Sequence, residues 1–168
     1  MADDDRYQRG AEMIKKVYAG DVVVPPKGAM AFSDLMLESL FAEVWTREEL
    51  SIRDRRMILF GAIGALGEKD TFAIQAKAAL KNEELTPEQL REIIITLANY
   101  AGYPRAAGMV RVVEEQIAAV AKEKVAEAEQ KVKALPAETT PEPAPSAAEP
   151  EKEPRDPRPP GGRRWRVT

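Results

Sequence analysis

The stretch 51–85, SIRDRRMILFGAIGALGEKDTFAIQAKAALKNEEL, decides the fold because it predicts two closely packed helices. Ser51 with Asp54 three residues later is a weak form of the capping box, and Gly67 is a helix stop. The second helix carries Gln75, and glutamine neither takes nor gives a proton at neutral pH. An unpaired buried amide costs about 1–3 kcal/mol, so we expect Gln75 to have a hydrogen-bond partner.

The glycines inside this stretch do not form a nucleotide-binding loop, because their spacing is wrong and no strand precedes them. We expect Gly61 and Gly64 to admit a close helix neighbour, at about 1 kcal/mol of lost helix propensity each. The stretch therefore predicts a helical hairpin and leaves the reaction open.

Working outward, the chain predicts an all-α bundle of about six helices. The last helix ends in the alanine- and charge-rich segment 121–133, which we expect to project from the body or to pack on a partner chain. The helix opened by Thr86 and Pro87 is apolar over most of its circumference and is expected to be central. The remaining signals are the acidic cluster 3–5 and Gly20 for the first helix, Ser33 and Asp70 as N-caps of two others, Gly102 as a stop and Pro104 as the last start.

Composition limits the chemistry. The chain has 25 Lys+Arg, 28 Asp+Glu and a net charge of -3, which argues against a general nucleic-acid binder. It has neither cysteine nor histidine. Disulfides, thiolate metal sites and thiol peroxidase chemistry are therefore excluded, and we expect no cofactor and no metal. The N-terminus lacks an apolar signal region and no run reaches the roughly 18 apolar residues of a membrane span, so we expect a cytoplasmic protein without a membrane partner.

The last part of the chain changes character. Nine of the thirteen prolines lie in 136–168, which is almost free of aliphatic residues. We therefore expect a helical domain over 1–135 and a disordered Pro/Ala/Glu-rich tail over 136–168. The tail ends in arginines around Trp165, which either dock on an acidic protein partner or stay solvated; these arginines are Arg155, Arg158, Arg163, Arg164 and Arg166.

Several ordered motifs carry a family resemblance. They are Arg6-Tyr7-x-x-Gly10, Trp45-x-Arg47-x-x-Leu50-Ser51-x-Arg53-x-x-Arg56, Ala79-Leu80, Thr86-Pro87-Glu88 and Tyr100-x-Gly102-x-Pro104. Over about residues 6 to 120 the chain resembles the carboxymuconolactone decarboxylase family, which is related to the alkylhydroperoxidase D-like proteins. The resemblance implies an all-helical fold built on a helical hairpin. It also implies self-association as a homotrimer or homohexamer, with pockets near the subunit contacts.

The chain departs from the family at the residues that carry its chemistry. The family's usual Glu-Leu-x-x-His element falls on 71–75, where this chain has Thr71 and Gln75 in place of the carboxylate and the imidazole. The Cys-x-x-Cys pair of peroxidase relatives would fall at Glu68 and Thr71. A thiol cycle cannot run here.

Decarboxylation of a lactone acid needs cations for its carboxylates and a group that delivers a proton. Arg47, Arg53 and Arg56 suit the first task, because arginine meets a carboxylate with two hydrogen bonds. Alternatively, they pair with nearby acidic residues and hold the loop between helices. The other candidates are Trp45 as a pocket floor or a core residue, Gln75 for orienting a carbonyl, and Tyr100 or Glu43 for proton transfer or for structural contacts.

Two functions stay open. The first is a divergent decarboxylase-like lyase that acts on a small lactone or carboxylate metabolite. The second is a non-catalytic oligomer that binds ligands or keeps the fold and recruits partners through its tail. Convergence of Arg47, Gln75 and Tyr100 on one cavity would favour the first function, and a filled core at that place would favour the second.

Overall fold

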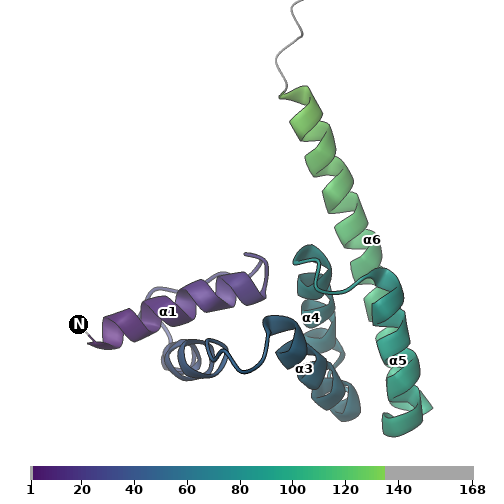
Figure 1. Ribbon diagram of the computed structural model, residues 1–168, viewed down its shortest axis with the longest axis horizontal. Coiled ribbons are helices and arrows are strands. Elements are labelled where there is room, and N and C mark those ends of the chain that lie inside the picture. Colours follow the sequence, from purple (N-terminus) through teal and green to yellow (C-terminus); the bar gives the residue numbers. More distant parts are fainter. Residues whose placement is uncertain (1, 135–168) are drawn as a thin grey trace, which may run out of the picture. The chain divides into compact units, whose positions relative to one another are not determined.

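The computed structural model describes residues 2–134, and these residues are all-α, as predicted, without a strand. The elements are α1 (Ala2–Val17), α2 (Ala31–Leu35), η1 (Met36–Val44), α3 (Ile52–Leu66), α4 (Lys69–Lys81), α5 (Pro87–Ala101) and α6 (Tyr103–Lys133). α2 continues directly into η1, a π-helix, so residues 2–134 form six helical rods (Figure 1). The predicted tail, with its docking end, lies outside the described residues.

The first core lies between α1 and η1. Tyr7, Ile14 and Val17 of α1 are buried against Leu37 and Phe41 of η1. Gly10 lies at the closest approach of the two helices. A Cβ atom at this position would overlap the backbone carbonyl of Leu37, so a larger residue cannot be accommodated without a shift of α1.

The second core is built by the hairpin of α3 and α4 together with α5 and α6. Phe60 of α3 and Phe72 of α4 are both fully buried, with ring centroids 4.7 Å apart. Leu90 of α5 and Met109 of α6 close this core. The predicted helical hairpin thus forms part of the larger core.

Three predicted helix boundaries are confirmed. The side chain of Ser51 accepts a hydrogen bond from the backbone N–H of Asp54 at 3.0 Å, which completes a capping box with the return bond to Asp54. Thr86 and Gln89 form a second capping box at the start of α5. Gly67 ends α3 in the left-handed conformation, with a φ of 82°.

Two predicted N-caps are wrong. The second helix begins at Ala31 and so places Ser33 inside it, because Asp34 instead accepts a hydrogen bond from the N–H of Gly28 and holds the preceding turn. α4 begins at Lys69, one residue before the predicted cap Asp70. Glu68 takes the N-cap position without a side-chain cap hydrogen bond, and its own N–H is bound to the carbonyl of Ile63 at the end of α3.

Two packing predictions also need correction. Gly64 does admit a close neighbour, since a Cβ there would lie 2.6 Å from Cδ1 of Leu97, but a Cβ at Gly61 would meet open space. α5 is not the central helix of the protomer. It buries one stripe and leaves Ile95 58% exposed, because consecutive isoleucines point to different faces of a helix. α4 is the most enclosed helix.

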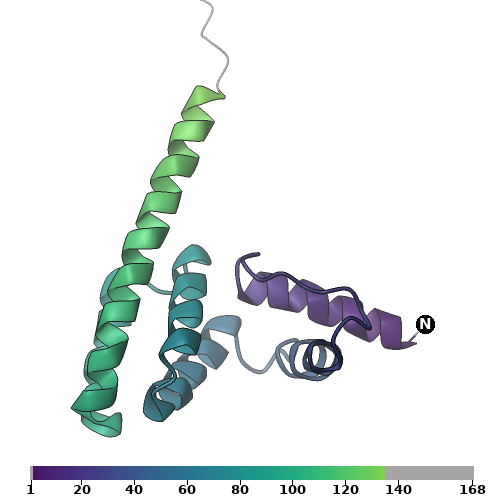
Figure 2. The ribbon, with the colours of Figure 1, turned by 180° about the vertical axis from the view of Figure 1, so that it is seen from behind.

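α6 is the longest helix and packs on α4 and α5 with its first half. Its second half extends beyond the ends of those helices in both views (Figures 1 and 2). No helix within residues 2–134 combines the length and the hydropathy needed to cross a membrane.

Candidate functional site

The position of Gln75 lies in a buried polar cluster where the two cores meet. Arg56 of α3 is fully buried and Gln75 of α4 is 1% exposed. Arg56 lies one turn before Phe60 on the same face of α3, so the helical period that buries the phenylalanine buries the guanidinium as well. A buried charge of this kind requires partners on every side.

Every nitrogen of the Arg56 guanidinium has a partner. Nε and Nη2 donate to the two carboxylate oxygens of Glu84, at 2.6 and 3.0 Å. Nη2 also donates to the backbone carbonyl of Val17 at 2.6 Å, and Nη1 donates to Oε1 of Gln75. This two-pronged contact with Glu84 is the geometry in which arginine binds a carboxylate most strongly. Four of the five guanidinium N–H groups thus donate to protein oxygens, and the group is closed off from solvent.

Gln75 has the partners that its burial requires. Its Oε1 accepts from Arg56, and its Nε2 donates to the hydroxyl of Tyr18 at 2.9 Å. Asn82 supports the opposite side of the cluster by donating from Nδ2 to Oε1 of Glu84 at 3.0 Å. The cluster therefore joins the end of α1, the α3–α4 hairpin and the loop before α5.

Tyr18 is the point at which the cluster reaches a hollow. Burial raises the pKa of the Tyr18 phenol, although the hydrogen bond from Gln75 and the charge of Arg56 oppose this effect. The phenol is therefore neutral at ordinary pH and keeps its own proton. The adjoining hollow has a volume of about 310 Å³ and is lined by Tyr18, Lys77, Gln116 and Ile74 among others.

Asp21 and Lys77 line this hollow, and they form an ion-pair network with Lys81 and Glu123. Nζ of Lys77 lies 3.0 Å from Asp21 and 2.9 Å from Glu123, and Lys81 contacts the same two carboxylates. Hydrogen bonds to Glu123 and Asp21 raise the pKa of Lys77. Burial alone would raise the pKa of Asp21, but the hydrogen bonds from Lys81 and Lys77 outweigh burial and lower it. The four charges sum to zero.

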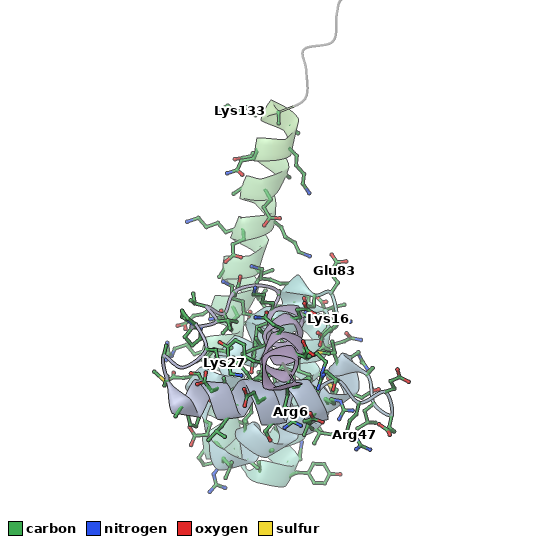
Figure 3. The ribbon with its side chains drawn as sticks, turned by 90° about the vertical axis from the view of Figure 1, so that its left-hand side faces the viewer. Arg6, Lys16, Lys27, Arg47, Glu83 and Lys133 are labelled. Atoms are coloured by element: carbon green, nitrogen blue, oxygen red, sulfur yellow. The ribbon has the colours of Figure 1, made fainter. Side chains whose placement is uncertain are left out.

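The structure brings Arg56 and Gln75 together, but it does not bring Arg47 or Tyr100 to them. The side chain of Arg47 is 59% exposed and pairs with Glu49 at 3.1 Å. Figure 3 shows Arg47 at the edge of the folded body. Tyr100 is 89% exposed.

The other predicted site residues also lie apart from Gln75. Arg53 is exposed and donates from Nε to the backbone carbonyl of Glu84 at 3.1 Å. Glu43 lies on the surface and pairs with Arg6 and Arg9, and Trp45 stacks on Phe41 in the first core, with ring centroids 6.2 Å apart. At this position the protomer therefore has a filled polar core.

Sequence reasoning missed two members of the cluster, Tyr18 and Glu84. Tyr18 appears in the sequence as the last residue of an apolar stripe, and Glu84 as one of two adjacent loop glutamates. One usable signal was Arg56, a charge four residues after Ile52 on the buried face of a helix, since such a charge demands a carboxylate elsewhere in the chain.

Within residues 2–134 no three side chains of His, Cys, Asp or Glu gather in a way that could hold a metal ion.

Comparison with known proteins gives two matches. The model of the carboxymuconolactone decarboxylase family matches residues 31–115. A curated protein of Acinetobacter baylyi (strain ATCC 33305 / BD413 / ADP1), named 4-carboxymuconolactone decarboxylase, is 26% identical over 132 residues, which cover 74% of this chain and 98% of that protein.

Proposed function

Because the chain belongs to the carboxymuconolactone decarboxylase family, we propose that it acts on a small lactone or carboxylate metabolite as a divergent lyase without thiol chemistry. The observation that carries the proposal is the hydrogen bond from the Gln75 amide to the hydroxyl of Tyr18, a residue that lines the hollow. In this chain the phenol takes the place of a side chain at position 75 as the proton-bearing group.

The reaction that fits this arrangement is loss of CO2 followed by protonation of carbon. The bond between the carboxylate carbon and the lactone ring breaks, and its electron pair passes into the conjugated ring. A carbon of the ring then takes the phenolic proton of Tyr18, and water returns a proton to the phenolate. A positioned acid of this kind typically contributes about 10²–10⁴-fold to the rate.

Lys77 is the cation for the substrate. An ammonium group has three N–H donors, and Asp21 and Glu123 occupy two of them. The third donor can meet a substrate carboxylate or carbonyl. Since Asp21 and Lys77 in the lining carry opposite charges, we propose that a lactone with one carboxylate binds better than one with two.

Arg56 and Gln75 position Tyr18 and do not touch the substrate. Their contacts fix the phenol in one orientation, because Gln75 is held on its other side by the buried guanidinium. A group held in this way loses little freedom when the substrate binds.

A pocket that uses Arg47, Arg53, Tyr100, Glu43 or Trp45 requires a second copy, since these side chains do not meet in the protomer. We keep assembly as a homotrimer or homohexamer as part of the proposal. Exposed apolar side chains on α2 support it, because Phe32 is 73% and Leu35 is 68% exposed.

A second candidate function is a non-catalytic oligomer that binds a ligand or keeps the fold as a scaffold, and recruits partners through its tail. The closed contacts of Arg56 and Gln75 favour it. At the place where the family's histidine would lie, this chain has a structural hydrogen bond.

The test is turnover by the full chain. Purified protein is incubated with 4-carboxymuconolactone and with a panel of small lactones and monocarboxylates, while CO2 release and thermal shift are recorded. Turnover that Tyr18→Phe abolishes and Tyr103→Phe leaves unchanged is the expected result, since Tyr103 is 70% exposed. Turnover that survives Tyr18→Phe would contradict the site. Ligand-induced stabilisation without turnover would favour the second candidate. The absence of both turnover and ligand-induced stabilisation would reject a metabolite function.

A further inference from the structure

The second half of α6 makes almost no contact with the rest of the protomer. From residue 121 to 134 every residue is exposed except Glu123, which is partly buried. Figure 3 shows Lys133 at the far end of this helix, away from the body. A helix of this length with no packed face is marginal in water, so an apolar stripe along it indicates a partner.

Such a stripe is present. Five small or β-branched residues follow one another at alternating spacings of three and four, and all are exposed: Ala118, Ala121, Val125, Ala128 and Val132. Val125 is 58% and Val132 is 69% exposed. Alternation of three and four is the spacing of a coiled-coil seam, with Ala118, Val125 and Val132 at the a positions and Ala121 and Ala128 at the d positions. We call these five residues the α6 seam.

The charges beside the α6 seam identify what covers it. Lys124 occupies a g position and Glu129 the e position that follows it in the next heptad. In a parallel pair of helices, g of one copy lies beside this e of the other, so two opposite-charge contacts form by symmetry. Glu129 has no ion pair with another described residue. Lys124 pairs with Glu83 at 3.1 Å, but both side chains are more than half exposed, which makes that contact weak.

We propose that the α6 seam pairs in parallel with the α6 seam of a second copy of this chain. Alanine at the d positions lets the two helices approach closely, and the valines at a positions, Val125 and Val132, favour two strands. The seam spans about two heptads, so it adds to contacts of the folded bodies and does not hold two copies by itself. The inference does not depend on the ligand or on catalysis.

The test uses the absence of cysteine from the chain. Val125→Cys and Val132→Cys each place a single thiol on the seam, and Glu127→Cys places one on an exposed position off the seam. Under mild oxidation of the full chain, both seam variants should form disulfide-linked dimers in several-fold higher yield than Glu127→Cys. Equal yields at all three positions, or none, would overturn the proposal. Linking only in a mixture of Val125→Cys with Val132→Cys would overturn the parallel orientation.

A charge exchange provides an independent readout. In the Val125→Cys background, Lys124→Glu and Glu129→Lys should each lower the yield of linked dimer, because each creates like-charge contacts. Mixing the two variants should restore it, since the mixed pair again has opposite charges at both contacts. Glu127→Lys is the matched control and should leave the yield unchanged. An oligomer by light scattering that shows no seam linking would leave assembly intact and reject the role of α6.

Discussion

Two cations near Tyr18, Arg56 in the buried cluster and Lys77 in the lining of the hollow, behave differently. Arg56 is fully buried, and four of its five guanidinium N–H groups donate to protein oxygens. The side chain of Lys77 is 29% exposed and contacts two carboxylates, which leaves one donor. The difference shows that burial decides the role of a charge. The buried Arg56 needs partners within the fold, whereas the partly exposed Lys77 can exchange a protein partner for a ligand.

The largest loss of stability should come from removing a partner of the buried cation Arg56. Glu84→Gln removes the charge that matches Arg56, and loss of one partner of a buried pair typically costs about 3–5 kcal/mol. We expect a fall of this size in the free energy of unfolding, measured by urea denaturation. Glu83→Gln is the control, because Glu83 is 79% exposed and its pair with Lys124 is worth about 0–1 kcal/mol. Equal effects of the two substitutions would mean that Arg56 is not held as described.

A smaller loss of stability should follow from removing the Gln75 amide, which links Arg56 to Tyr18. Gln75→Leu leaves a donor of Arg56 without its acceptor, at a cost of about 1–3 kcal/mol. Thr71→Val, one turn earlier on α4 and exposed, should change the free energy of unfolding by less than about 0.5 kcal/mol. A stable Gln75→Leu variant would show that the amide is dispensable for the cluster.

Gln75→His sharpens the comparison by placing a titratable group in contact with the buried cation Arg56. The chain has no other histidine, so one imidazole signal can be followed by NMR. Burial and the neighbouring guanidinium both disfavour a second positive charge, so the pKa of the introduced imidazole should fall below its usual value of about 6.5. The folded state then binds fewer protons than the unfolded state, and stability of the variant should fall as pH drops below about 6.5. An imidazole pKa at or above that value would show that water reaches the position.

The smallest loss of stability should come from changing Lys77, the partly exposed cation. The hydrogen bonds from Lys77 and Lys81 lower the pKa of Glu123, and the lysine hydrogen bonds lower that of Asp21 against the effect of burial. Stability from these carboxylates is therefore present above their unfolded pKa values of about 4 and is lost as pH falls through the lower folded values. Lys77→Met should lower the free energy of unfolding by about 0.2–1 kcal/mol at neutral pH, and this cost should become smaller when salt is added. The variant should also lose less stability than the parent protein as pH falls. A salt-independent cost would point to lost packing of the lysine stem.

The fold was predictable because its signals are local. The capping residues at Ser51 and Thr86 and the stop at Gly67 act within one helical turn, and each is found in the structure. The predicted N-caps at Ser33 and Asp70 are wrong because other residues form the turns before these helices. Asp34 accepts a hydrogen bond from the N–H of Gly28, and the N–H of Glu68 is bound to the carbonyl of Ile63. The candidate site was less predictable. The sequence indicates that Gln75 and Arg56 need partners, but their partners Tyr18 and Glu84 are 57 and 28 residues away along the chain.

The contact at Gly10 has a consequence for how quickly the buried position can be reached. The backbone of α1 rests directly on η1 there. The same helix ends with Val17, and Val17 and the next residue, Tyr18, both bind to the polar cluster. α1 also lies before the stretch 31–115 that the family model matches. Detachment of α1 alone would therefore return Arg56 and Gln75 to solvent while the hairpin stays folded. Access to this position is then set by the rate at which α1 detaches and docks again, which hydrogen exchange of the α1 amides would report.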